Sequence, residues 1–268
     1  PKVIESRKTT LELLLSNHEK KCLSCVRSGN CELQKLSNEY GCDESKFSGI
    51  KTPTAPEFEN DYLIRDNGKC ILCRRCVAAC NKYQTVGVIG ANKRGFNTTI
   101  GCAFGRALAD VDCVACGQCI NVCPVGALTE KDDTDKVVAA LGDKSKHVIA
   151  VTAPAVRVAL GEEFGFPVGT DTEGKMVAAL RRIGFDKVFD VDMAADLTIM
   201  EEGTELLSRL GDKNATLPMI TSCSPGWIRF IEFNYPELLG HLSTCKSPQQ
   251  MMGATIKTYY AEKNGIDP

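Results

Sequence analysis

The fold of this 268-residue chain is decided by two cysteine-rich stretches, Cys70-Ile71-Leu72-Cys73-Arg74-Arg75-Cys76-Val77-Ala78-Ala79-Cys80 and Cys113-Val114-Ala115-Cys116-Gly117-Gln118-Cys119-Ile120-Asn121-Val122-Cys123-Pro124. Each has three cysteines at C-x2-C-x2-C spacing and a fourth after three more residues. Short loops of that spacing can wrap three thiolates around one face of an iron–sulfur cubane, while the fourth cysteine reaches a different iron. Zinc would use four ligands in two pairs and leave thiolates over, and disulfides between such close neighbours would be strained. We therefore predict two [4Fe-4S] clusters.

The two stretches resemble a bacterial two-cluster ferredoxin, in which the fourth cysteine serves the other cluster. Pro124 follows the last cysteine as in that family, whereas Asn81 stands where the first half often has proline. The resemblance implies two ligand sets: Cys70, Cys73, Cys76 and Cys123 for one cluster, and Cys113, Cys116, Cys119 and Cys80 for the second.

Composition limits the classes of function. The chain is long enough for two or three small domains, and 43% hydrophobic and 25% charged residues are ordinary for a globular protein. A formal net charge of −2 argues against nucleic acid as a partner, which would require a basic excess. The chain has fifteen cysteines, most of which cluster in metal-ligand spacings; this predicts a reducing compartment, and hence the cytoplasm. No apolar run is long enough to predict a membrane span.

A third group of ligand-type residues lies near the beginning of the chain. His18, Cys22, Cys25 and Cys31 follow the pattern H-x3-C-x2-C-x5-C. One imidazole and three thiolates can bind four irons or a single zinc ion, and the histidine could also be a plain surface residue. The adjoining ferredoxin-like stretches favour iron.

This third motif resembles the one-histidine, three-cysteine [4Fe-4S] site of [FeFe]-hydrogenases and of the large iron–sulfur subunit of complex I. In those families the site follows a plant-type [2Fe-2S] domain, so a [2Fe-2S] cluster is expected in a missing amino-terminal part. Both ends of the chain, at Pro1 and Pro268, look cut, which suggests a fragment. Cys42 and Cys102 stand outside the motifs, and we expect them to be ordinary small residues.

The first half of the chain gives weaker signals for its other elements. Apolar positions predict a helix over 3–17, and proline and threonine predict a linker over 51–56. A short strand is expected within 57–66, a glycine- and asparagine-rich excursion over 86–100, and a connecting helix over 134–141.

The second half alternates between strands and helices. Val148-Ile149-Ala150-Val151 is a short apolar run typical of a strand buried on both faces, and Thr172 is a candidate N-cap for an amphipathic helix that Gly184 ends. This order predicts a parallel α/β sheet with its chemistry at the carboxyl ends of the strands, where Pro154 and Cys223 would lie. The expected elements are strands at 148–151, 187–191 and 217–221, and helices at 154–164, 172–183 and 192–210.

Thr221-Ser222-Cys223-Ser224-Pro225-Gly226-Trp227 looks like the first active-site signature of the [FeFe]-hydrogenases, usually written TSCCPGW. Segments 152–157, 198–202 and 243–250 also resemble that family. With the cluster motifs in the same order, the resemblance covers essentially all 268 residues.

The resemblance implies an α+β multi-domain protein. Residues 1–55 would form a one-histidine, three-cysteine [4Fe-4S] domain, and residues 56–140 a two-[4Fe-4S] ferredoxin-like domain. Residues 141–268 would form the first half of an α/β domain with a parallel sheet, which holds the H-cluster. In this family the H-cluster is a cubane joined to a two-iron subcluster that carries CO, cyanide and a bridging azadithiolate.

The resemblance also implies a proton path. In the family it runs from the surface through two glutamates and a serine to a cysteine, and the matching positions are Glu205, Ser243, Glu202 and Cys223. Glu202 and Glu205 are three apart and share a helix face. Taken alone, they would usually be charges on a solvated face.

Several further positions match the lining of the two-iron pocket: Ala153, Pro154, Ser247, Pro248 and Gln249. Ser224 stands where the family has a cysteine that ligates the cubane, and a serine oxygen is a poorer iron ligand than a thiolate. Either Ser224 ligates, or Cys223 takes over, or the site is altered. Cys245 receives no role. The remaining cubane cysteines lie in later motifs that this chain lacks, so the chain alone does not hold a complete H-cluster.

We therefore expect part of a hydrogenase catalytic subunit that reversibly reduces protons to H2, fed with electrons by three [4Fe-4S] clusters. Expected partners are ferredoxin or NAD(P)H-oxidising subunits, because the Cys223-Ser224 variant resembles NAD(P)-linked hydrogenases and no G-x-G-x-x-G motif for a dinucleotide occurs here. Two alternatives remain: an electron-transfer subunit of the complex I or formate dehydrogenase type, and a non-catalytic hydrogenase-like sensor or assembly protein.

Overall fold

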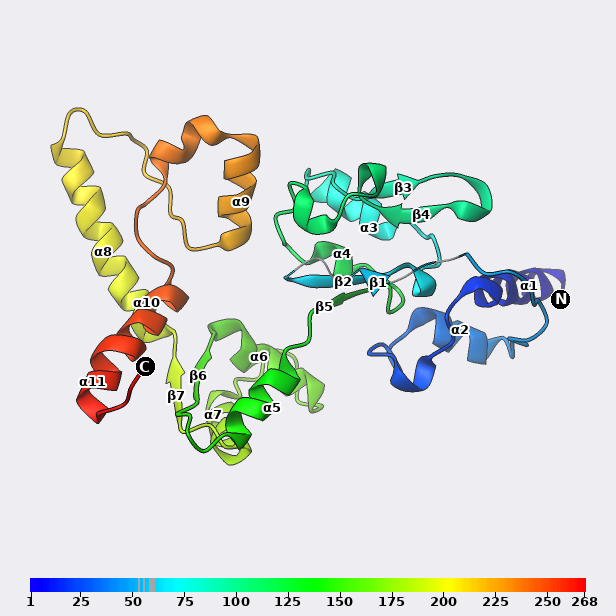
Figure 1. The fold of residues 1–268 in the computed structure, drawn as a ribbon, viewed down its shortest axis with the longest axis horizontal. Coiled ribbons are helices and arrows are strands. Elements are labelled where there is room, and N and C mark those ends of the chain that lie inside the picture. The colour runs from blue at the N-terminus through cyan, green and yellow to red at the C-terminus, as the bar shows by residue number, and fades with distance from the viewer. Residues whose placement is uncertain (53, 55, 58–60) are drawn as a thin grey trace. The chain divides into compact units, whose positions relative to one another are not determined.

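The computed structural model describes residues 1–52, 54, 56–57 and 61–268 (Figure 1). The chain folds into two compact units, Pro1–Lys131 and Asp132–Pro268, and both mix helices with strands. Of the predicted linker over 51–56, positions 53 and 55 lie outside the described residues, and so do positions 58–60 of the segment expected to hold a strand.

The first unit begins with a helical region. Its elements are α1 (Lys2–Asn17), the 3-10 turn η1 (Cys22–Ser24) and α2 (Glu32–Glu39). Leu11 and Leu15 are buried on one face of α1, and Leu33 is buried on α2. The helix predicted over 3–17 is thus confirmed, because its apolar residues recur at helical spacing.

The remainder of the first unit is built on small antiparallel sheets. Strand β2 lies between β1 and β5, and Arg65 of β2 pairs with Leu128 of β5. A separate hairpin joins β3 to β4 within the glycine-rich excursion. The strands are β1 (Pro56–Glu57), β2 (Leu63–Asp66), β3 (Gly90–Asn92), β4 (Thr99–Gly101) and β5 (Leu128–Glu130).

Short helices follow each cysteine loop. They are α3 (Arg75–Ala78), which continues as the π-helix η3 (Ala79–Tyr83), and α4 (Gln118–Asn121). The other single turns are η2 (Asn67–Lys69), η4 (Gly95–Asn97), η5 (Ala103–Gly105) and η6 (Leu108–Asp110). The helical region docks on this part: the Glu32 amide donates to the Pro124 carbonyl (3.0 Å), and Arg75 pairs with the Glu32 carboxylate (2.7 Å).

The second unit contains a two-stranded parallel sheet in which Ile149 pairs with Lys187 and Thr152 with Asp190. Its first elements are α5 (Thr134–Gly142), β6 (Ile149–Thr152), α6 (Pro154–Glu163), α7 (Glu173–Ile183), β7 (Lys187–Asp190) and α8 (Asp192–Gly211). Gly184 follows α7 with φ +123°, a conformation that favours glycine, so the predicted helix end is confirmed.

Arg157 joins four elements of this unit. From α6 its guanidinium pairs with Asp190 at the end of β7 (2.9 Å), with Asp192 at the start of α8 (2.7 Å) and with Glu173 of α7 (3.6 Å). The three carboxylates surround one half-buried cation. These ion pairs therefore hold the first turns of α6, α7 and α8 near one another at the end of β7.

Helices complete the second unit. They are α9 (Pro225–Asn234), the 3-10 helix η7 (Pro236–His241), α10 (Pro248–Thr255), the π-helix η8 (Ile256–Tyr260) and α11 (Ala261–Asn264). Helix α10 packs on α8, where the Thr198 hydroxyl lies 3.2 Å from the Met251 sulfur. Ile231 of α9 and Met252 of α10 are almost completely buried.

Two expectations for this unit are corrected. Residues 217–221 were expected to form a third strand of the sheet, but Ile220 makes only an isolated parallel bridge, to Leu242, and Pro218 lacks the N–H that a ladder needs. Pro154 follows β6 at the carboxyl edge of the sheet, as expected. Cys223 does not follow a strand of this sheet, so the shared edge predicted for the two residues is wrong. Thr172 occupies the N-cap of α7, but its hydroxyl donates to the Arg157 carbonyl (2.7 Å) instead of capping the helix.

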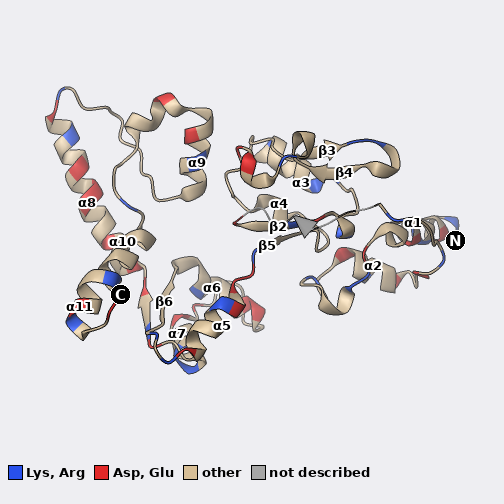
Figure 2. Ribbon diagram, in the orientation of Figure 1, with Lys and Arg blue, Asp and Glu red and all other residues tan. Residues whose placement is uncertain are grey.

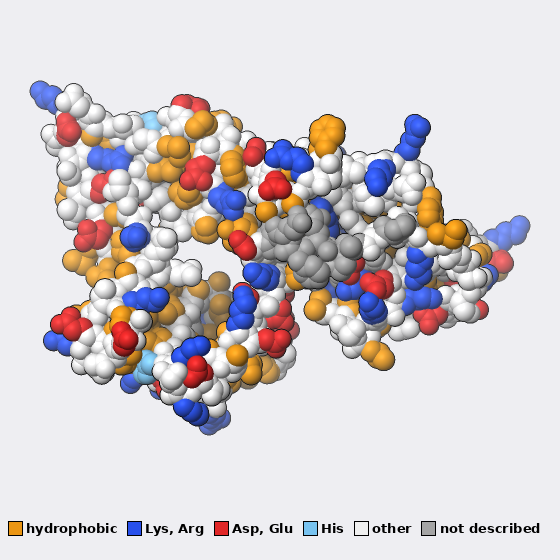
Figure 3. Space-filling model, viewed as in Figure 1, with side chains coloured by type: hydrophobic (Ala, Val, Ile, Leu, Met, Phe, Trp, Pro, Cys, Tyr) orange, Lys and Arg blue, Asp and Glu red, His pale blue; other side chains and the backbone are white. Residues whose placement is uncertain are grey.

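The surface carries mixed charge. Figure 2 shows basic and acidic residues interspersed along the ribbon of both units, with acidic residues along α8. Figure 3 shows apolar side chains at the surface of both units, and on α8 these include the exposed Ile199 and Leu207. In the described part of the chain, no helix is long and apolar enough to cross a membrane.

Candidate functional site

The first predicted ligand set lines a single cavity in the first unit. Its four thiols come from the first cysteine loop and from the end of the second: Cys70, Cys73, Cys76 and Cys123. Burial, together with smaller effects of the neighbouring thiols of Cys70, Cys123 and Cys73, raises the pKa of Cys76 to about 11. Each thiol therefore lies within electrostatic reach of the other members of the set.

The second set is brought together in the same way. Burial raises the pKa of Cys119 to about 12, and the thiols that add to this effect are Cys113, Cys116, Cys76 and Cys80. Three of these belong to the second predicted set, and Cys76 belongs to the first. The two sets therefore adjoin each other near Cys76 and Cys119.

The two cysteine loops share a backbone pattern that explains how nearby thiols converge. Leu72 and Arg74 have φ of +55° and +60°, and the corresponding positions of the second loop, Ala115 and Gly117, have +56° and +72°. Alternating left-handed residues curl a loop so that its amides and side chains face inward. The Leu72 amide accordingly donates to the Cys70 sulfur (3.4 Å).

The chemistry of these donors fits an iron–sulfur cluster. All fifteen cysteines are free thiols, and burial is the main reason for the raised pKa values of Cys76 and Cys119. Bound iron would hold these ligands as thiolates. Within the described residues, no three histidine, cysteine or acidic side chains are close enough to hold a single metal ion.

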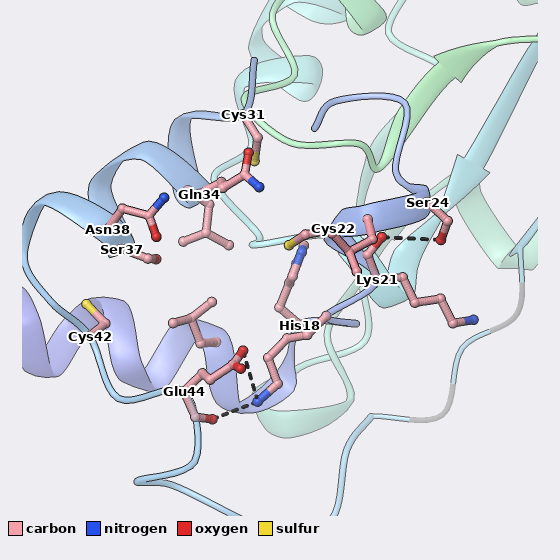
Figure 4. A pocket seen from close by; sticks show the side chains of 14 residues that line it. His18, Lys21, Cys22, Ser24, Cys31, Gln34, Ser37, Asn38, Cys42 and Glu44 are labelled. Atoms are coloured by element: carbon pink, nitrogen blue, oxygen red, sulfur yellow. Dashed lines mark hydrogen bonds and ion pairs between the residues drawn. The ribbon is translucent and has the colours of Figure 1, made fainter. Parts of the chain in front are cut away.

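The histidine motif surrounds a separate open cavity of about 560 Å³ (Figure 4), within the usual range for ligand sites. His18 ends α1, Cys22 lies in η1, and Cys31 precedes α2. Burial lowers the pKa of His18, so the ring is neutral at pH 7, as a metal ligand must be. Its Nδ1 atom is buried and has no hydrogen-bond partner in the described part of the chain, which fits a nitrogen that binds metal.

The fourth member of this motif lies elsewhere. Cys25 does not line the cavity; its sulfur lies over Gly126, where a Cβ atom would come within 2.8 Å of it. The cavity instead extends to Cys42, at the end opposite His18 in Figure 4. The structure thus brings three of the four predicted residues together and places Cys25 against the segment that follows Cys123.

In the second unit, Glu205 of α8 is the centre of a hydrogen-bonded group. The Ser243 hydroxyl and the Thr244 amide both donate to Oε2 of Glu205 (3.0 Å each), and Arg209 pairs with Oε1 (2.6 Å). The Cys245 thiol lies 3.7 Å from the carboxylate. Partial burial raises the pKa of Glu205, but the bonds from Arg209, Thr244 and Ser243 outweigh it, so the net pKa is lowered.

The other two members of the predicted proton path are not joined to this group. Glu202 lies one turn earlier on α8, and Cys223 is exposed before α9. Neither side chain has a hydrogen bond among the described residues. The structure therefore connects Glu205 with Ser243, and leaves Glu202 and Cys223 as separate side chains of the same unit.

The predicted pocket residues share one feature, which is their place at helix starts. Ala153-Pro154 begins α6, Ser224-Pro225 begins α9, and Ser247-Pro248 begins α10 with Gln249 in its first turn. Proline suits the first helical position because no partner for its missing N–H is needed there. The Ser247 side chain caps its helix, whereas the exposed Ser224 side chain makes no capping bond.

Sequence reasoning missed two residues of the Glu205 group, Arg209 and Thr244. Arg209 follows Glu205 at i, i+4 on one helix, a spacing that favours an ion pair. This ion pair could therefore have been predicted from the sequence. Thr244 contacts Glu205 through its backbone amide, which no residue pattern encodes.

Three families of known domains match the chain. Residues 146–268 match the iron only hydrogenase large subunit, C-terminal domain. Residues 7–46 match the NADH-ubiquinone oxidoreductase-G iron–sulfur binding region, and residues 61–129 match the NADH-quinone oxidoreductase subunit 3 ferredoxin-like domain. A ferredoxin-like domain and an iron-hydrogenase C-terminal domain are thus both present.

Known hydrogenases are similar to the chain in sequence. The chain is 53% identical to the NADP-reducing hydrogenase subunit HndD of Solidesulfovibrio fructosivorans and 46% identical to iron hydrogenase 1 of Clostridium pasteurianum, in each case over 99% of the chain and 46% of the relative. The periplasmic [Fe] hydrogenase large subunit of Nitratidesulfovibrio vulgaris is 54% identical over 48% of the chain and 31% of its own length. The chain thus spans a little under half the length of the first two relatives. The chain is therefore similar to iron-only hydrogenases, and its residues 146–268 match the C-terminal domain of their large subunit.

Proposed function

We propose that this chain is part of a hydrogenase catalytic subunit, which interconverts protons and electrons with hydrogen: 2H⁺ + 2e⁻ ⇌ H2. The observation that carries the proposal is the bond between Ser243 and Glu205, in a segment similar to the hydrogenase C-terminal domain. A carboxylate and a hydroxyl held at 3.0 Å can pass a proton between them. In the same chain, the gathered thiols of the first unit are suited to carrying electrons.

The electron path would use three [4Fe-4S] clusters. The first-unit thiols would hold two of them, in the sets Cys70, Cys73, Cys76, Cys123 and Cys113, Cys116, Cys119, Cys80. The third would be held by His18, Cys22, Cys25 and Cys31, which requires the Cys25 side chain to turn from Gly126 toward the cavity.

The proton path would run from Glu205 through Ser243 and Glu202 to Cys223. Ser243 is suited to relay because its hydroxyl donates to Glu205 and accepts from the Cys245 amide (3.1 Å). Arg209 keeps Glu205 ionised and ready to receive a proton. Glu202 and Cys223 would complete the path once side-chain motion brings them into hydrogen-bond reach.

An H-cluster in the complete protein would supply the metal site at which protons and electrons combine. The helix starts at Ala153-Pro154, Ser224 and Ser247-Pro248-Gln249 would line its pocket. Free N–H groups and the positive end of the dipole at a helix start favour negatively charged groups, which suits a cofactor that carries cyanide. Ser224, exposed and free of a capping role, is available to face such a group.

Electron partners would be ferredoxin or subunits that oxidise NAD(P)H, in line with the NADP-reducing name of one relative. We place the protein in the cytoplasm because its free thiols need a reducing compartment. A [2Fe-2S] cluster in the whole protein would provide a further entry point for electrons.

Infrared spectroscopy of the whole protein, matured and purified without oxygen, tests the proposal. CO and cyanide bands together with hydrogen evolution are expected. Intact clusters without these bands would overturn the proposal and support an electron-transfer subunit or an assembly protein. Reconstitution of the 268-residue chain should separately give about twelve irons, four for each of three cubanes.

A further inference from the structure

Arg65 occupies a position where strands normally bury apolar side chains. It lies on β2 two residues after Leu63, so the two side chains point to the same face of the strand. Leu63 is 3% exposed and Arg65 only 6% exposed. A charged residue is rarely buried to this degree unless its charge acts on something nearby.

The surroundings of Arg65 identify what its charge acts on. Arg65 lines the same cavity as Cys70, Cys76 and the other thiols of the first predicted set. The guanidinium therefore belongs to a side chain that borders the place where the first cluster would be held.

The backbone of the neighbouring hairpin makes room for this side chain. A Cβ atom added to Gly101, at the end of β4, would lie 3.2 Å from Nη2 of Arg65 and 3.4 Å from Cζ. Glycine at this position lets the guanidinium lie close against the strand, so β4 fixes the distance between the charge and the cavity.

We propose that Arg65 is a positioning residue that raises the reduction potential of the cluster held by Cys70, Cys73, Cys76 and Cys123. The inference rests on the proposed function, which places a cluster there. Reduction adds one electron to the cluster and no proton, so the reduced form carries one more negative charge. A buried cation stabilises that form, and the low dielectric of the interior strengthens the effect.

Arg74 provides a matched control. It lines the same cavity, but its side chain is exposed to solvent, so water screens its charge. The two arginines thus differ mainly in burial, and the proposal requires the buried one to have the larger effect on the cluster.

The experiment is a redox titration of the reconstituted 268-residue chain, followed by electron paramagnetic resonance of each cluster. R65Q should lower the midpoint of one cluster, so that the ratio of reduced to oxidised cluster at the wild-type midpoint falls about tenfold, equivalent to about 59 mV for one electron. R65K, which keeps the charge, should cause a smaller shift than R65Q. R74Q should shift the same cluster much less, and the other two clusters should not move.

The outcomes separate this inference from the proposed function. If the wild-type chain binds no cluster at the Cys70 site, the proposed function fails first. If the clusters form and R65Q leaves every midpoint unchanged, or if R65K shifts the midpoint as far as R65Q, the role of the Arg65 charge is overturned. If the R65Q variant loses the cluster, the G101A variant provides the test instead. The added methyl group displaces the Arg65 guanidinium, so the midpoint of the cluster at the Cys70 site should shift. An unchanged midpoint in G101A would overturn the proposal.

Discussion

In the first unit, three thiols of the Cys70 set come from one seven-residue loop, Cys70–Cys76, and only the fourth is distant. In the second unit, the bond between Ser243 and Glu205 joins residues 38 positions apart. A short loop with alternating left-handed residues gathers thiols locally, whereas the proton-handling group needs α8 and the segment before α10 to pack correctly. The cluster sites therefore depend mainly on local backbone shape, whereas the Glu205 group depends on tertiary packing.

The largest expected effect tests the local half of this comparison. Cys76→Ala removes a thiol of the first set, so anaerobic reconstitution should give about eight irons per chain instead of about twelve. The measurement is iron and sulfide content per chain. Cys102→Ala is the matched control, because Cys102 is a buried thiol of the same core that belongs to neither set, and it should keep about twelve irons. Equal iron contents in the two variants would remove Cys76 from the ligand set.

The sequence predicted this unit well where spacing alone carries the information. The C-x2-C-x2-C spacing predicted two clusters. The resemblance to two-cluster ferredoxins implied that Cys123 joins the first loop and Cys80 the second, and this ligand assignment stays a prediction. The spacing gave no indication that Cys25 lies over Gly126, because the docking of the helical region on the segment after Cys123 is a tertiary contact. The buried position of Arg65 likewise depends on how β2 pairs with β5.

In the second unit, periodicity predicted the two paired strands and the helices between them. It failed at 217–221, because an apolar run does not specify its partner, and Pro218 removes a donor from any ladder. The sequence also predicted that the Thr172 side chain caps α7. In the structure, its hydroxyl donates instead to the carbonyl of Arg157, fifteen residues earlier. The bond from Ser243 to Glu205 followed from the family resemblance, since no local pattern links the two positions.

The effect of intermediate size concerns the tertiary packing of the second unit. Arg157→Met should lower the guanidinium concentration at which the second unit unfolds, because it breaks the ion pairs with three carboxylates. The fluorescence of Trp227, the single tryptophan, reports guanidinium unfolding of this unit. The iron content should not change, because the network lies wholly in the second unit.

The control for Arg157 is Lys146→Met, which breaks the exposed pair with Asp143 (3.5 Å) and should change stability by less than about 0.5 kcal/mol. If the two variants unfold at the same guanidinium concentration, Arg157 does not join α6, α7 and α8 as argued. If Arg157→Met also loses iron, the two units do not respond independently, and the contrast between them is wrong.

The smallest expected effect concerns Glu205 and its pH dependence. Glu205→Gln removes the charge that Arg209 pairs with and should cost about 1 kcal/mol at pH 7. The pKa of Glu205 is lowered from its ordinary value of about 4.5, so its ionised form stabilises the fold above that pH, and the stabilisation is lost as the pH falls through the lowered pKa. The difference in unfolding free energy between the wild type and Glu205→Gln should therefore shrink between pH 6 and pH 3.5.

Trp227 fluorescence, measured on both proteins at each pH, gives this difference directly. Glu201→Gln provides the control on the same helix: its side chain is exposed and makes no hydrogen bond within the described residues, so its substitution should change stability at pH 7 by less than about 0.5 kcal/mol. A Glu205→Gln difference that stays constant down to pH 3.5 would mean that the carboxylate charge does not hold the Ser243 segment against α8. The relay would then lack the fixed geometry that proton transfer needs.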